Sequence, residues 1–145
     1  EPAAAIGRVQ LRRLPQLVKK HRELAEQYLR NLADTGLGFQ ADHPDRIWQT
    51  FAVVLPEGVN RPSLRAKLKE AGIETQIASY GLHRLAAFRT APCFSETGGP
   101  LALAVSDRLH DRGLALPLHS ELSAADVLRV CQELKKALSL PEVCA

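Results

Sequence analysis

Side chains that can exchange protons and bind polar ligands are concentrated in one short stretch, residues 79–84. It contains Ser79, Tyr80, His83 and Arg84 around a glycine. Imidazole exchanges a proton near neutral pH, and hydroxyl and guanidinium groups donate hydrogen bonds to polar substrates. The stretch follows a predicted strand, where loops often carry function. For His83, a functional role and simple packing in the loop are equally supported by the spacing.

Motifs that would form a complete catalytic site by themselves are absent from the sequence. It has no GxxxxGK phosphate loop, no HExxH zinc motif and no GxSxG nucleophile turn. The residue types of a Ser79–His83–Asp catalytic triad are present, but almost any chain of this length contains them, so they are not specific evidence for a triad. All six lysines lie in charged segments predicted as helices, where solvation is the expected role. We therefore predict no catalytic residue, no cofactor-binding residue and no Schiff-base lysine in this chain.

The other four histidines have ordinary structural explanations. His21 lies on the apolar side of a predicted helix, which favours a core or interface histidine over a ligand. His43 precedes a proline in a polar loop and is expected to face solvent. His110 is predicted near the end of a charged helix, where a cation complements the helix dipole. His119 follows a predicted strand and is placed at the border of a possible cleft.

The three cysteines predict neither a disulfide framework nor a metal site. Cys93, Cys131 and Cys144 are far apart, odd in number and without a CxxC pair. Cys131 falls on the apolar stripe of a predicted helix, so we expect a small buried hydrophobic residue there. No metal ligands are predicted, and a reducing compartment, the cytoplasm, is the expected location.

The composition is that of an ordinary globular protein. The chain has 145 residues, 46% hydrophobic and 24% charged, with a net charge of +3. Its apolar runs are far shorter than the ~20 residues that a membrane-spanning helix needs. It has no methionine and opens on Glu1-Pro2-Ala3. This opening predicts a piece of a longer chain or a processed product.

A group of basic residues near the start of the chain leaves a second function open. These residues could contact the phosphates of a nucleic acid in a free-standing binding or regulatory module. The residues between them are aliphatic rather than aromatic, which disfavours stacking on bases. A solvated helix face or an interface with a partner domain is favoured for Arg8, Arg12, Arg13, Lys19, Lys20 and Arg22.

The elements that would position residues 79–84 alternate between helix and strand. Residues 3–32 predict a long helix, with a kink or a junction of two helices at Pro15. Residues 47–55 predict a strand, and Asn60 and Gly72 frame a second helix. In residues 73–77, residues suited to the core alternate with polar residues, which is typical of a half-buried strand.

The remaining residues complete the predicted alternation. Residues 90–100 predict a loop, residues 101–112 a helix and residues 114–118 a short strand. Ser123 starts a final helix. The sequence thus predicts one α+β domain, an α/β sandwich with a three- to four-stranded sheet flanked by helices. A connector helix over about 3–32 would lead into an α/β unit over about 46–140.

Six motifs, in order along the chain, resemble those of one known family. They are residues 4–11 with 22–28, then 48–56, 61–68 with 71–75, 80–88, 114–119, and 122–123 with 126–127. In this order they resemble the C-terminal small domain of the DegT/DnrJ/StrS aminotransferases. Gly81 and Ala86 depart from the pattern, because they stand where the family usually has proline. Pro15 and His21 also differ from the residues commonest in the family.

The resemblance implies the small domain of a fold type I, pyridoxal-phosphate-dependent transferase. The family transfers an amino group to nucleotide-linked keto-sugars. Its cofactor lysine would belong to a large domain upstream of this chain, so the chain alone is expected to be inactive. By position, Tyr80 and His83 would bind the substrate, and the small domain would close the cleft. The full enzyme is expected to be a homodimer without membrane contact.

Overall fold

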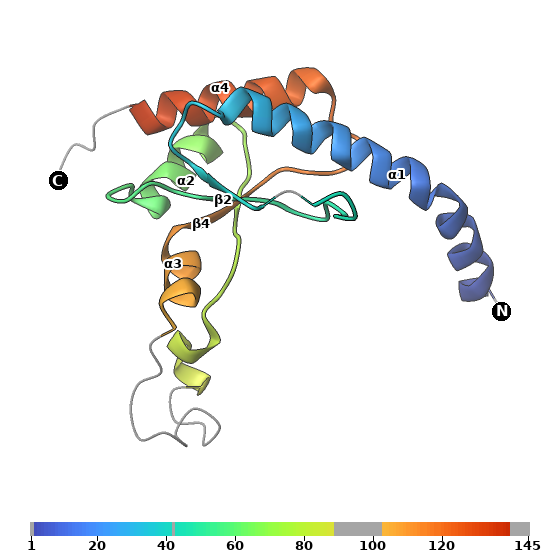
Figure 1. Cartoon of the computed structure of the whole chain (residues 1–145), viewed down its shortest axis with the longest axis horizontal. Helices are drawn as coiled ribbons and strands as arrows, with labels where there is room; N and C mark the ends of the chain where they lie inside the picture. The colour runs from blue at the N-terminus through green and yellow to red at the C-terminus, as the bar shows by residue number, and fades with distance from the viewer. Residues whose placement is uncertain (1, 42, 89–102, 140–145) are drawn as a thin grey trace.

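The computed structural model describes residues 2–41, 43–88 and 103–139 (Figure 1). Within them lies a four-stranded sheet with the order β1-β2-β4-β3. Each neighbouring pair is antiparallel, and Phe51 of β2 is paired with Leu116 of β4. The strands are β1 (Gly38–Phe39), β2 (Phe51–Val54), β3 (Gln76–Ile77) and β4 (Gly113–Leu116).

Helices packed against this antiparallel sheet confirm the predicted α+β class. Figure 1 shows α1, α2 and α4 together on one side of β2 and β4, while α3 extends away on the other side. Two short 3₁₀ turns lie beside α3. The helices are α1 (Pro2–Leu32), α2 (Arg61–Glu70), α3 (Ala104–Arg112) and α4 (Ala124–Ser139), and the 3₁₀ turns are η1 (Leu82–Arg84) and η2 (Ala86–Phe88).

Of the two alternatives predicted at Pro15, a kink or a junction of two helices, the structure contradicts the junction. The first helix runs unbroken from Pro2 to Leu32, and its N-terminal half curves visibly in Figure 1. A proline removes one backbone donor, which bends a helix of this length without ending it. Its buried residues all lie in the C-terminal half. Only that half packs in the core, while the apolar side chains of Ile6, Val9, Leu11 and Leu14 are exposed.

Aromatic stacking joins α1 to the sheet. The rings of Tyr28 and Phe51 are stacked with centroids 4.7 Å apart, and Trp48 lies 5.3 Å from Phe51. The Tyr28 hydroxyl donates to the Pro117 carbonyl oxygen at 2.9 Å, so this buried polar group has a partner. These rings fix the C-terminal half of α1 across β2.

Capping residues set the helix starts that the sequence predicted. The Asn60 side chain accepts from the Ser63 backbone N–H at 2.9 Å at the start of α2. At the start of α4, Ser123 and Asp126 form a reciprocal capping box, with the Ser123 N–H donating to Asp126 at 2.8 Å. The hydrogen bond from the Ser123 hydroxyl lowers the pKa of Asp126. Gly72 has a φ of +74°, which is suited to glycine after a helix.

The strands are shorter than the sequence predicted. β3 contains only Gln76 and Ile77, although Ile73 and Thr75 are buried as the alternation required. β3 lies at the edge of the sheet, and among the described residues it pairs with β4 alone. β4 ends before Pro117, which has no N–H to donate. The predicted loop over residues 90–100 lies outside the described residues.

None of the described helices has both the length and the apolar character needed to cross a membrane.

Candidate functional site

The stretch with Tyr80 and His83 lies against α3. It leaves β3 through Ala78, whose backbone N–H donates to the Gly113 oxygen at 3.3 Å. Gly81 follows and is buried. A Cβ added to Gly81 would come within 3.0 Å of the His83 ring and 3.4 Å of the Ser106 hydroxyl oxygen. The absence of a side chain at this position therefore lets the turn η1 approach α3 closely.

A carboxylate of α3 holds the imidazole of His83. Nε2 of His83 lies 2.9 Å from Oδ1 of Asp107, and the His83 side chain is only 15% exposed. A carboxylate can only accept, so Nε2 must carry the proton in this contact. A hydrogen bond of this kind fixes the orientation of the ring and the position of the Nε2 proton. His83 is thus presented in one orientation, as a residue that binds a ligand needs to be.

Arg84 extends this contact into a small charged network. Its Nη1 donates to Oδ1 of Asp111 at 2.6 Å and lies 3.7 Å from the Asp107 carboxylate. The hydrogen bond from Arg84 lowers the pKa of Asp111. The same bond raises the pKa of Arg84. Successive turns of α3 therefore anchor the η1 turn through opposite charges.

His110 connects the backbone of this stretch to Tyr80. Its Nδ1 accepts from the Gly81 backbone N–H at 3.0 Å, and its ring lies 6.2 Å from the Tyr80 ring at 67°. His110 is in the last turn of α3, as predicted. Its Nδ1 acts there as a hydrogen-bond acceptor, however, which requires that atom to be unprotonated. The bond also uses an N–H that a proline at the position of Gly81 would not have.

The structure thus brings Tyr80 and His83 together along one helix. The Tyr80 side chain is 55% exposed, while His83 is largely covered. The sequence interpretation missed the partners Asp107 and His110 in α3. Their spacing of three residues places them on one helical face, and this signal was available in the sequence.

Other predicted residues have the structural roles expected of them. Nδ1 of His21 lies 2.8 Å from the Trp48 carbonyl oxygen, which confirms a satisfied interface histidine. His43 is exposed. His119 borders a pocket of about 380 Å³ between the α2–β3 connection and α4. Cys131 is buried, and desolvation raises its thiol pKa to about 11.

Metal binding finds no support in the described part of the chain, where no group of His, Cys, Asp and Glu has the geometry of a metal site. Cys93 and Cys144 lie outside the described residues.

In the basic group of α1, Arg22 donates to the Pro44 and Arg46 carbonyl oxygens, and Lys19 lies 4.0 Å from Glu23. These contacts fit a solvated helix face better than a row of phosphate ligands.

Comparison with known proteins decides the family. The family model described as the DegT/DnrJ/EryC1/StrS aminotransferase family matches residues 1–135. The chain belongs to this family. The DegT/DnrJ/EryC1/StrS match covers β1 to β4, the η1 turn and α3, and therefore includes the whole candidate site.

Relatives within the family include proteins named for sugar amination. The chain is 32% identical over 143 residues to a dTDP-4-dehydro-2,3,6-trideoxy-D-glucose 4-aminotransferase from Saccharopolyspora spinosa, covering 93% of this chain and 34% of that protein. The aminotransferase TlmJ from Streptoalloteichus hindustanus has a TM-score of 0.79 at 31% identity, covering 94% of this chain and 36% of TlmJ. DesV from S. venezuelae, solved with a ketimine intermediate, has a TM-score of 0.80 at 25% identity, covering 96% and 36%.

The chain spans about a third of the length of these family members. Pyridoxal phosphate, the cofactor associated with the family, needs a lysine in a shielded site. Within the described residues, which include all six lysines, none is buried. Lys135 instead pairs with Asp34 at 2.7 Å, and Lys136 lies 3.7 Å from Glu133. The lysines of this chain therefore do not fit that role.

Proposed function

We propose that this chain is the C-terminal small domain of a pyridoxal-phosphate-dependent aminotransferase that acts on a nucleotide-linked keto-sugar. The observation that carries the proposal is the family match over nearly the whole chain, combined with coverage of only 34% of the Saccharopolyspora relative. That relative is named for a dTDP-linked keto-sugar. The cofactor supplies the electron sink for amino transfer, and in this proposal it is bound by a domain outside this chain.

Tyr80 and His83 are assigned to substrate binding in this proposal. The exposed phenol of Tyr80 can donate a hydrogen bond to a sugar hydroxyl or phosphate oxygen. The Asp107 carboxylate presets the His83 ring, so His83 loses little rotational freedom when a ligand binds. A preorganised pair of this kind orients a substrate, and the small domain would exclude water when it closes on the cleft.

The exposed half of α1 provides a surface for the missing domain. Ile6, Val9, Leu11 and Leu14 are apolar and largely exposed along this half. Apolar side chains gathered on one helix segment mark an interaction surface. In the proposed enzyme this segment is the connector that packs against the cofactor domain, and the whole enzyme is a homodimer in the cytoplasm.

The chain alone is expected to form no stoichiometric adduct between the cofactor and one particular lysine, because none of its lysines lies in a shielded site. The test mixes the 145-residue chain with pyridoxal phosphate, reduces the sample with borohydride and measures the intact mass. A longer chain that includes the segment upstream of Glu1 serves as the comparison. It is expected to gain one cofactor mass per chain, while the 145-residue chain gains none.

A stoichiometric adduct on one lysine of the 145-residue chain would overturn the assignment to a domain without the cofactor lysine. Absence of an adduct on the longer chain would contradict the proposed enzyme itself. The two results therefore separate the domain assignment from the assignment of cofactor chemistry.

A further inference from the structure

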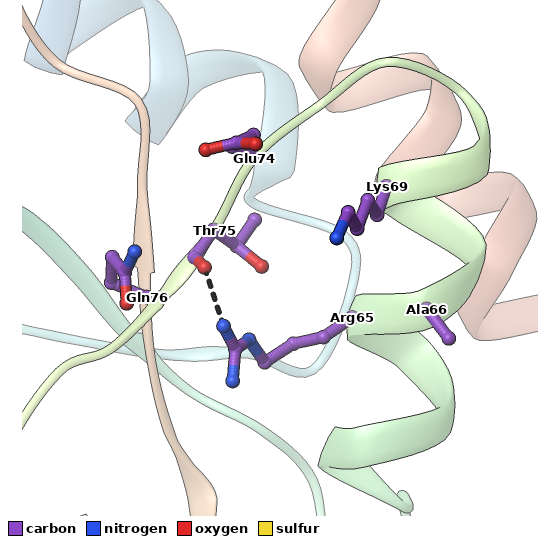
Figure 2. A pocket seen from close by; sticks show the side chains of 6 residues that line it. All are labelled: Arg65, Ala66, Lys69, Glu74, Thr75 and Gln76. Atoms are coloured by element: carbon purple, nitrogen blue, oxygen red, sulfur yellow. Dashed lines mark hydrogen bonds between the residues drawn. The ribbon is translucent and has the colours of Figure 1, made fainter.

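A polar pocket lies between α2 and the chain that enters β3 (Figure 2). Its volume is about 290 Å³. Its lining comes from α2, the residues that lead into β3 and the first residue of β3, whereas the stretch with Tyr80 and His83 follows β3. The pocket is lined by Arg65, Ala66, Lys69, Glu74, Thr75 and Gln76.

Two buried polar atoms of this pocket lack partners. Thr75 is only 6% exposed, and its Oγ1 has no hydrogen-bond partner within the described part of the chain. Nε of Arg65 is also buried and has no hydrogen-bond partner among the described residues. Leaving buried polar groups unpaired is unfavourable, so such a pair in one pocket calls for an explanation. A ligand that accepts hydrogen bonds from both groups would provide one.

The surrounding contacts aim these groups into the pocket. Nη2 of Arg65 donates to the Thr75 carbonyl oxygen at 2.9 Å, which fixes the guanidinium beside the threonine. Figure 2 shows the Thr75 hydroxyl pointing into the space between Arg65 and Lys69. These donors come from two separate elements, α2 and the strand entry, so the site is built by the tertiary fold rather than by one helix.

The charge of the pocket is positive on the side where the donors converge. Arg65 and Lys69 are four residues apart, which places them on one face of α2. The Lys69 side chain reaches from α2 toward Thr75 in Figure 2, and the Glu74 side chain extends away from it. The Lys69 ammonium and the Thr75 hydroxyl are therefore directed at one volume, which the Arg65 guanidinium borders. Together they match an anion with several acceptor oxygens.

We infer that this pocket binds a phosphate group through Arg65, Lys69 and Thr75. A phosphate presents oxygens in several directions, and its charge balances the two cations. Inorganic phosphate and the phosphate of a larger metabolite, such as a nucleotide, share this chemistry. The inference stands apart from the proposed transfer reaction, because it uses none of the residues assigned to the sugar substrate.

The test is a titration of the isotope-labelled 145-residue chain with sodium phosphate, followed by NMR through the backbone amides of Thr75 and Gln76. Sodium chloride keeps the ionic strength constant. A parallel titration with dTDP distinguishes a nucleotide phosphate from free phosphate. Saturable shifts are expected at these amides. Lys69→Gln should weaken binding about tenfold, equivalent to ~1.4 kcal/mol.

Lys67→Gln is the matched control, since it removes the same charge two residues away on the same helix, outside this pocket. The affinity of Lys67→Gln for phosphate should equal that of the unmodified chain.

Thr75→Val removes the unpartnered hydroxyl at nearly constant volume. It should abolish most of the response while leaving the melting temperature in the absence of phosphate unchanged or higher.

Three results would overturn the inference. The first is a lack of saturable shifts with both phosphate and dTDP. The second is equal loss of affinity in Lys69→Gln and Lys67→Gln, which would indicate general charge attraction. The third is a Thr75→Val variant that binds phosphate as tightly as the unmodified chain.

Discussion

Replacing Phe51 with alanine is expected to lower the free energy of unfolding by about 3–5 kcal/mol. Phe51 is 1% exposed and is stacked on Tyr28 at 4.7 Å, with Trp48 at 5.3 Å and Phe39 at 6.4 Å. Its removal leaves a cavity at the junction of α1 and the sheet. The loss is a large part of the ~5–15 kcal/mol that stabilises a typical domain. Urea unfolding followed by circular dichroism measures it.

Ile47→Ala provides the control for this core variant. Ile47 precedes the same strand but is 64% exposed, so its replacement should change stability by less than ~0.5 kcal/mol. If Phe51→Ala cost no more than Ile47→Ala, the aromatic junction would not be the centre of the core.

The second large effect concerns the substrate and is expected in the proposed full-length enzyme, the longer chain that would bind the cofactor. His83→Ala should raise KM for the nucleotide sugar and lower kcat/KM about 10–100-fold, the loss expected for a hydrogen bond to a charged group. The change in KM should exceed the change in kcat, because His83 is assigned to binding rather than to proton transfer. Steady-state kinetics with varied sugar concentration separates the two.

His43→Ala is the matched control, since it removes an exposed histidine from a different loop. Its kinetic constants should equal those of the unmodified enzyme. Asp107→Asn tests the positioning role, because a neutral amide leaves the ring of His83 less firmly held. It should raise KM by less than His83→Ala does. A value of kcat/KM within twofold of the unmodified enzyme for His83→Ala would contradict the binding role.

The helices were predictable because each long helix carries its own periodic signal. Apolar residues at helical spacing near the C-terminus are Val127, Val130, Cys131, Leu134 and Leu138; the first four are buried in α4 and Leu138 is partly buried. The same spacing in α1 includes Leu14, which is exposed. Periodicity shows which face is apolar but not whether the same domain covers it.

The sheet was harder to predict because its pairing depends on residues far apart in sequence. β1 contains only Gly38 and Phe39, too few residues for any alternation to be visible. The position of β4 between β2 and β3 arises from long-range packing, and no local pattern encodes that order. The sequence therefore predicted the fold class and approximate strand positions without the pairing.

The sequence predicted the loop residues of the candidate site but not the residues of α3 that hold them in place. His83 stood out because it follows a strand, whereas Asp107 is 24 residues further along and belongs to a helix whose position the sequence does not reveal. Arg65 and Lys69 resembled an ordinary solvated helix face. Only the tertiary structure places Thr75 beside Arg65 and shows its hydroxyl to be unpartnered.

Hydrogen–deuterium exchange of the longer chain, with and without a dTDP-linked keto-sugar, tests directly whether residues 79–84 contact the substrate. Slower exchange is expected at residues 79–84 when the sugar is bound, including the Gly81 amide that is hydrogen-bonded to His110. The N-terminal half of α1, which packs against the cofactor domain in the proposed enzyme, should not respond to the sugar. Unchanged exchange at residues 79–84 under saturating sugar would contradict the claim that this stretch contacts the substrate.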